Sequence, residues 1–89
     1  MSDNIGDSVA NSTVELDVSG MICPLPVLRA RKALAALGPG EMLRVLCTDP
    51  AAATDFPAYC EAAGHTLLET NCRELPQGPE LTFLIRRGG

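Results

Sequence analysis

Hydrophobic and polar residues alternate in four stretches of this chain, and each stretch predicts a β-strand. The four stretches are residues 13–18, 42–48, 65–72 and 80–86. Because successive side chains of a strand point to opposite faces, Leu81, Phe83 and Ile85 are expected to share one face of the last strand. The pattern is typical of a sheet with one face packed against other elements.

The interval between the first two strands predicts a helix over residues 24–37. Its apolar residues fall on one side, which we expect to face the sheet: Val27, Ala30, Leu34 and Leu37, with Pro26 and Ala33 at the margin. Cys23 is the predicted N-cap and Pro24 the first helical residue, because the fixed φ of proline suits a helix start. The glycine at position 38 is the expected C-terminal stop.

A second helical region follows the second strand. Asp49 is its predicted N-cap and Pro50 its first residue. Pro57 interrupts the pattern, because proline removes a hydrogen bond from a helix interior. We therefore expect either a kinked helix or a short turn followed by a helix over residues 56–63, with Asp55 as its cap.

The resulting order, βαβαββ, predicts a two-layer α/β (α+β) sandwich. Its mixed four-stranded sheet has both helices on one face, since right-handed crossovers are strongly favoured. Residues 1–12 show no periodicity and are predicted to form a disordered N-terminal tail. Residues 13–89 are predicted to form a single domain with a modest core.

Composition and charge narrow the classes of function. The 89 residues have a net charge of −4, which argues against a broad basic surface for nucleic acid. The chain has no apolar run as long as the roughly 18 residues of a membrane span. Its first 12 residues lack the basic-then-apolar order of a signal peptide. We therefore expect a cytoplasmic protein with reduced thiols, with no membrane partner and no direct contact with nucleic acid.

The predicted helix start gives Cys23 a distinctive environment. Pro24 and Pro26 have no N–H group. Only the amides of Cys23 and Leu25 are therefore expected to stay free near the sulfur. The helix dipole favours an anion at this end by about 0.3–1 kcal/mol, so the pKa of the thiol should fall modestly. Such a thiol is suited to accepting a sulfur atom and giving it up again. The alternative is that Cys23 is an inert, buried apolar residue.

Residues 16–27 contain a Cys-Pro-x-Pro motif and are followed by Arg31-Lys32-Ala33-Leu34. This stretch resembles the signature of the TusA/SirA-like sulfur-carrier family. Further matches to the family lie at residues 39–41, 49–51, 56–60 and 84–89, so the resemblance covers residues 14–89. It implies a small two-layer α/β domain in which Cys23 is the carrier thiol, at a helix start formed by Pro24, Leu25 and Pro26.

The resemblance also implies a mechanism and partners. Cys23 would hold sulfane sulfur as a covalent persulfide, with no other cofactor. A cysteine desulfurase or rhodanese-type protein would be the donor, and a DsrE/TusD-like protein the acceptor. The sulfur would most commonly serve 2-thiolation of the wobble uridine of tRNA, or else another sulfur-trafficking pathway. The chain would be a sulfurtransferase-like carrier rather than a stand-alone turnover enzyme, and we expect a monomer.

The side of the first helix that faces away from the sheet suggests where such partners would bind. Five residues form this predicted docking patch: Leu25, Leu28, Arg29, Arg31 and Lys32. The two leucines would anchor a partner and the basic side chains would steer it. The alternative is an ordinary solvated helix face with incidental leucines.

The remaining three cysteines are expected to be buried or distant from Cys23, and their roles stay open. Cys47 and Cys60 should face the core, whereas the exposure of Cys72 is undetermined from the pattern. Disulfides are typical of secreted chains, and no close cysteine pair suggests zinc; Cys60 and His65 are the only close candidates. We therefore expect no metal site. His65 is expected at the surface or in packing, and capping alone is expected to explain Asp49.

Two alternative functions stay open. The terminal Gly88-Gly89 resembles the end of ubiquitin-like sulfur carriers, but those chains begin with a β-hairpin, and this chain goes from its first strand into a helix. A small sheet of this order could also serve a non-enzymatic regulatory or RNA-binding module, because fold does not fix function. The acidic balance argues against RNA binding.

Overall fold

A computed structural model of the chain describes residues 13–88. The elements are β1 (Thr13–Asp17), α2 (Leu25–Ala35), β2 (Met42–Cys47), α3 (Ala52–Ala63), β3 (Thr66–Leu75) and β4 (Gly78–Arg86). This order confirms the predicted βαβαββ sequence. The tail predicted for residues 1–12 lies outside the described residues. Within residues 13–88 no helix is long and apolar enough to cross a membrane.

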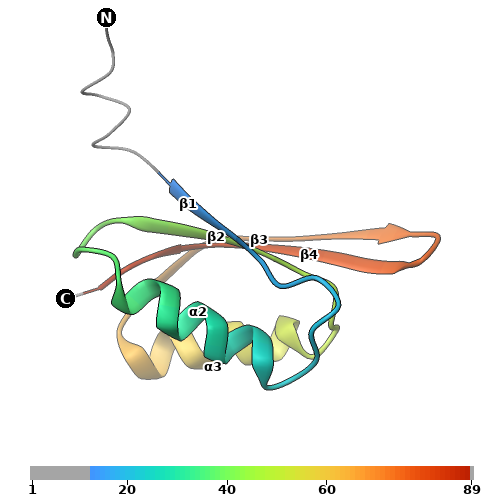
Figure 1. Ribbon diagram of the computed structural model, residues 1–89, viewed down its shortest axis with the longest axis horizontal. Coiled ribbons are helices and arrows are strands. Elements are labelled where there is room, and N and C mark those ends of the chain that lie inside the picture. Colours follow the sequence, from blue (N-terminus) through green and yellow to red (C-terminus); the bar gives the residue numbers. More distant parts are fainter. Residues whose placement is uncertain (1–12, 89) are drawn as a thin grey trace, which may run out of the picture.

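The strands form one four-stranded sheet in the order β1-β2-β4-β3. β1 pairs with β2 in parallel, whereas β4 runs antiparallel to both of its neighbours, β2 and β3. Both helices cover the same face of the sheet (Figure 1). The predicted mixed sheet in a two-layer α/β sandwich is therefore confirmed.

The parallel pairing of β1 with β2 determines which loops meet. Asp17, the last residue of β1, is paired with Leu46, and the ladder continues where the Val18 amide donates to the Leu46 carbonyl at 2.9 Å. Parallel neighbours end at the same edge of a sheet. The loop after β1, which contains Cys23, therefore leaves the sheet beside the loop that begins at Thr48.

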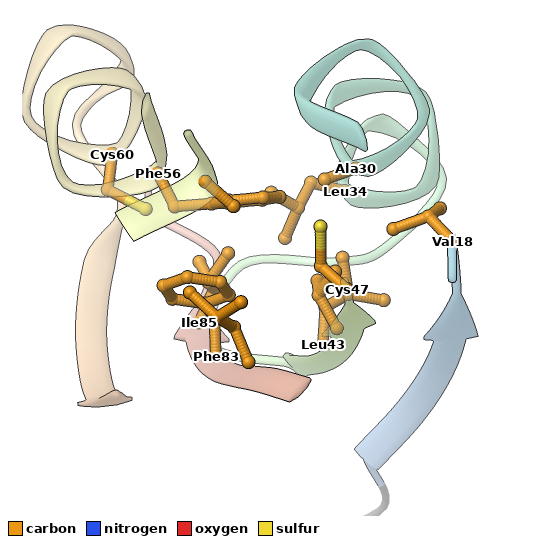
Figure 2. Packing of buried hydrophobic residues seen from close by; sticks show 12 residues of the cluster. Val18, Ala30, Leu34, Leu43, Cys47, Phe56, Cys60, Phe83 and Ile85 are labelled. Carbon is orange, nitrogen blue, oxygen red and sulfur yellow. The ribbon is translucent and has the colours of Figure 1, made fainter. Parts of the chain in front are cut away.

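The core lies between the helices and the covered face of the sheet. Side chains from both helices and from β2 and β4 meet there (Figure 2). The rings of Phe56 on α3 and Phe83 on β4 stack with centroids 4.6 Å apart. Leu81, Phe83 and Ile85 are all buried, as the alternation of β4 predicts. The chain has only two phenylalanines, and both form this stacked pair between the two layers.

Helix α2 begins later and ends earlier than predicted. Its N-cap is Pro24, not Cys23, and its last residue is Ala35. The Leu25 amide donates to the Ile22 carbonyl at 2.9 Å, which closes a turn before the helix. At the other end, the amide of Leu37 donates three residues back, so a tighter turn follows the α-helix. The predicted apolar face is confirmed, because its residues are buried or packed against the core: Pro26, Val27, Ala30, Ala33, Leu34 and Leu37.

Helix α3 is continuous across Pro57, which decides between the two predicted alternatives. It runs from Ala52, with Ala51 rather than Asp49 at the N-cap position, and it ends at Gly64 in the left-handed conformation, as predicted. Proline at position 57 has no N–H for the carbonyl of Ala53, one turn earlier. Both residues lie on the exposed side of the helix, where water can satisfy that carbonyl.

Strands β3 and β4 are longer than the pattern predicts. They form a hairpin in which Leu75 is paired with Gly78, so only Pro76 and Gln77 remain in the loop. Gly78 has φ 129°, a conformation that other residues rarely adopt. The residues predicted as a connecting loop therefore form a tight turn between extended strands.

The C-terminal end of the described chain is held in place by specific contacts. Arg87 Nε donates to the Leu34 carbonyl near the end of α2 at 2.9 Å. The Gly88 amide donates to His65 Nδ1 at 3.0 Å, so His65 has a packing role. Gly88 also lies against the main chain of Gly64, where a Cβ atom would collide. These contacts explain why a residue without a Cβ atom is required at position 88, the first glycine of Gly88-Gly89.

The stacked aromatic pair generates a stability prediction. Phe83→Ala removes a fully buried ring and leaves a cavity, so we expect the free energy of unfolding in urea to fall by about 3–5 kcal/mol. Leu68→Ala, at a side chain that is 39% exposed, is the matched control and should cost about 0.5 kcal/mol or less. Equal losses in the two variants would contradict the packing described here.

Candidate functional site

Cys23 lies in the loop that joins β1 to α2, and its side chain is exposed. Two turns shape this loop. The Met21 amide donates to the Val18 carbonyl at 3.1 Å, with Gly20 at φ 84°, and the turn between Ile22 and Leu25 follows. The loop therefore changes direction twice before the helix begins, and it presents residue 23 between the two turns.

The segment that follows β2 anchors this loop. Thr48 Oγ1 accepts a hydrogen bond from the Gly20 amide at 2.8 Å. Asp49 Oδ2 accepts one from the Cys23 amide at 2.6 Å. The other carboxylate oxygen of Asp49 accepts from the Ala51 amide at 3.0 Å, next to the start of α3. The expectation that capping alone explains Asp49 is wrong, because its second oxygen binds the main chain of Cys23.

The amides at the helix start do not surround the sulfur as predicted. The Cys23 amide donates to Asp49, and the Leu25 amide donates within the turn to Ile22. Neither amide is left free for an anion. The N-cap position belongs to Pro24, so Cys23 stands one residue outside the helix. The proposed direct stabilisation of a thiolate by free helix amides is therefore absent from the site.

The electrostatics of Cys23 also differ from the prediction. Its pKa is raised above the usual value for a thiol. A hydrogen bond with the Asp55 carboxylate is the largest cause, followed by desolvation and by the negative charges of Asp55 and Asp49. The predicted lowering by the helix dipole is overridden by these two carboxylates. The two carboxylates therefore disfavour the thiolate form of Cys23.

Exposed apolar side chains flank the sulfur. Leu25 is 47% exposed and Leu28 is 48% exposed, both on the side of α2 that faces away from the sheet. Arg29, Arg31 and Lys32 are also exposed, so all residues of the predicted docking patch are accessible. Ile22, directly before Cys23, is 69% exposed, and the sequence pattern did not predict this exposure. Its position in the loop rather than in the helix kept it out of the periodic pattern.

The other cysteines lie in two different environments. Cys47 and Cys60 are buried, as predicted, and burial raises the pKa of both thiols. Cys72, whose exposure the sequence left undetermined, is exposed on β3, and all four cysteines are free thiols. Within the part of the chain that the structure describes, no group of three His, Cys, Asp or Glu side chains could hold a metal ion.

Comparison with known proteins identifies the family of this chain. The family model described as Sulfurtransferase TusA matches residues 14–87. The chain belongs to this family. The sulfur carrier protein TusA of Allochromatium vinosum is 40% identical to it over 79 residues, which make up 89% of this chain and 99% of that protein.

A solved structure extends the comparison to the fold. The crystal structure of a SirA-like protein from Desulfitobacterium hafniense matches with a TM-score of 0.66 and 30% identity. The match covers 85% of this chain and 99% of that one. These similarities confirm the TusA/SirA-like family resemblance and support a sulfur-carrier role, which requires contact with proteins that donate and accept sulfur.

The burial of the four thiols generates an accessibility prediction. Iodoacetamide under native conditions should label Cys23 and Cys72, the two exposed cysteines, and leave the two buried cysteines unlabelled. All should react after denaturation. Peptide mass mapping identifies the labelled positions. Native labelling of Cys47 at the rate of Cys72 would show that the core described here opens readily.

Proposed function

We propose that this protein accepts sulfane sulfur on Cys23 as a persulfide and relays it to an acceptor protein. The single observation that best supports the proposal is the exposure of Cys23 in an anchored loop, with exposed Ile22 and Leu25 close to it in sequence. A carrier sulfur must reach the sulfur atoms of two other proteins in turn. An exposed thiol bordered by apolar side chains meets that requirement.

The loading step needs only thiol and persulfide chemistry. The Cys23 thiolate attacks the outer sulfur of a cysteine persulfide on the donor. A bond forms between Cys23 Sγ and that sulfur, while the bond from the donor cysteine to the same sulfur breaks. The donor leaves as a thiolate, and the proton that Cys23 released to solvent balances the proton that the donor thiolate takes up. Relay to the acceptor repeats the exchange with Cys23 as the leaving thiolate.

The docking patch formed by Leu25, Leu28, Arg29, Arg31 and Lys32 is proposed to bind donor and acceptor alike. Its exposure on α2, the helix that follows the sulfur loop, supports this assignment. Leucine anchors contribute to affinity when a partner buries them, and basic side chains speed the encounter with an acidic surface. The same surface would be reused, because a carrier presents one sulfur to successive partners.

The family resemblance supports the finer assignments. The donor is proposed to be a cysteine desulfurase or a rhodanese-type protein, and the acceptor a DsrE/TusD-like protein. The sulfur is proposed to serve wobble-uridine 2-thiolation of tRNA or another sulfur-trafficking pathway in the cytoplasm. The net charge of −4 favours delivery through proteins over direct contact of this chain with tRNA.

Mass spectrometry of the loaded protein tests the carrier role. After incubation with a cysteine desulfurase and cysteine, the wild-type protein should gain the mass of one sulfur atom, and dithiothreitol should remove it. Cys23→Ser should keep the fold and lose this gain entirely, because the substitution removes the attacking thiol. A Cys23→Ser protein that loads fully would disprove the assignment.

Two controls accompany this measurement. Cys72→Ser removes the other exposed thiol and should load as the wild type does. Deletion of Gly89 alone tests the alternative of a terminal thiocarboxylate, and it leaves the contacts of Gly88 intact. Loading that depends on Gly89 would favour that alternative. Absence of loading with a desulfurase and with a rhodanese fed thiosulfate would favour the regulatory module.

Reversal of one charge in the docking patch tests partner steering. Arg31→Glu should slow association with the desulfurase severalfold at low ionic strength, and the difference should shrink at high salt because salt screens exposed charges. Arg86→Glu, an exposed change at the end of β4, is the matched control. Association rates can be measured by biolayer interferometry. Equal rates for the two variants would refute a role for the patch.

A further inference from the structure

Strand β3 forms one edge of the sheet and is exposed along most of its length. Its neighbour is β4, and no other strand of residues 13–88 lies on its far side. Every residue from Leu68 to Glu74 is exposed. In an antiparallel ladder the main-chain N–H and C=O groups of alternate residues point to opposite sides of the strand. One set of these groups on β3 therefore points away from β4, where a further strand can pair with it.

The usual protections of a sheet edge are weak on the outer part of β3. Proteins shield such edges with prolines, bulges and charges that repel a second strand. The register shift of β3 lies between Leu67 and Glu69, and the pairing with β4 is regular from Glu69 to Leu75. The strand contains no proline. Its outer part therefore has the geometry of a pairing edge, and its charges decide what can pair there.

The charges of β3 complement themselves. Glu69 and Arg73 lie on the same face, because they pair with Leu84 and Glu80, which alternate with the buried residues of β4. If two β3 strands pair in antiparallel orientation about Asn71, Glu69 of each copy lies opposite Arg73 of the other. Two-fold symmetry forms this contact twice. Opposite charges in directly opposed positions stabilise a pair of strands.

Neighbouring registers lack this complementarity. Moving one strand by one residue places Glu69 opposite Glu74 in one direction and opposite Cys72 in the other. Moving it by two residues places Glu69 opposite Leu75 or Asn71. None of these registers brings a basic residue to Glu69, and one of them opposes two carboxylates, which is unfavourable. Among these registers the charges therefore favour the one centred on Asn71.

The opposite edge of the sheet is protected against such pairing. β1 carries Glu15 and Asp17 and no basic residue, so two copies of β1 would bring like charges together. The loop with Cys23 follows β1, and β1 and β3 lie at opposite edges (Figure 2). Helix α3, not α2, packs against β3. Pairing through β3 therefore leaves the Cys23 loop and the docking patch on α2 accessible.

We propose that two copies of this protein pair through their β3 strands in antiparallel orientation, with Glu69 of each copy opposite Arg73 of the other. Arg73 already binds Glu80 of its own chain at 2.6 Å, and its side chain is 65% exposed. Its guanidinium has enough donors to bind a second carboxylate. The contact is confined to one strand of each copy, so it is weak and forms at high protein concentration. This monomer–dimer equilibrium replaces the monomer expected from the family resemblance, and it goes beyond the proposed function because it does not involve Cys23.

Sedimentation velocity over protein concentrations from tens of micromolar upwards tests the pairing. The weight-average mass of the wild type should rise with concentration toward that of a dimer. Glu69→Arg opposes like charges at both contacts, so the association constant should fall by about tenfold. Glu15→Arg makes the same change of charge on the exposed strand at the other edge, and it should associate as the wild type does. A wild-type protein that stays monomeric up to about a millimolar would overturn the proposal.

A mixture of two variants tests the charge complementarity. Arg73→Glu should also lose association, because each Glu69 then faces a carboxylate. When Glu69→Arg and Arg73→Glu chains are mixed, opposite charges meet at both contacts. The mixture should therefore form heterodimers at concentrations at which each variant alone is monomeric. Absence of recovery in a mixture of two folded variants would overturn the register.

Disulfide cross-linking tests the register without any change of charge at Glu69 or Arg73. In a chain that also carries Cys23→Ser and Cys72→Ser, Asn71→Cys should form a covalent dimer with oxidised glutathione, because the two copies of position 71 face each other. Glu69→Cys in the same background is the matched control. It should cross-link far less, since position 69 of one copy lies opposite position 73 of the other. Equal cross-linking of the two variants, or none with Asn71→Cys, would overturn the register.

These experiments involve no sulfur donor, so they are independent of the loading experiment. A monomeric protein that still loads sulfur on its thiol would remove the pairing and keep the carrier function. Association through β3 together with absent loading would keep the pairing and remove the carrier function.

Discussion

The parallel pairing of β1 with β2 is the constraint on which the site depends. It ends both strands at one edge of the sheet, so the loop that contains Cys23 and the segment that begins at Thr48 emerge side by side. Residues separated by 26 positions can then form a direct hydrogen bond. Both helices cover the same face of the sheet (Figure 1). The position of the sulfur follows from sheet topology before any side-chain chemistry is considered.

Local electrostatics at Cys23 are decided by neighbouring carboxylates rather than by the helix. A helix dipole contributes about 0.3–1 kcal/mol, and the effect falls off within the first turn. In this structure the amide of Cys23 is already used by Asp49, and the Asp55 carboxylate, with a smaller contribution from Asp49, raises the pKa of the thiol. The helix start therefore offers no free amide to a thiolate, and the nearby carboxylates disfavour that form. The pKa of this exposed thiol is therefore raised rather than lowered, in contrast to the prediction from the helix dipole.

The local elements of the fold could be predicted because their causes are local. The alternation of β4 gave the correct core residues, and Gly64 ended α3 in the left-handed conformation that favours glycine. The boundaries near prolines were less predictable. Pro24 is the N-cap instead of the first helical residue. Pro57 lies inside a helix, where water can reach the Ala53 carbonyl that lacks an N–H partner. The solvent exposure of that carbonyl is a property of the folded chain.

The sequence by itself determined the element order, the family, and Cys23 as the candidate thiol, since periodicity, glycine and proline positions and a contiguous motif are all readable along the chain. It also identified Leu25 and Leu28 as exposed residues, because helical spacing alone separates them from the buried face. Only the tertiary structure decided the surroundings of the sulfur. Asp49 reaches the Cys23 main chain through space, and contacts between residues far apart in sequence exist only after the sheet has brought their loops together.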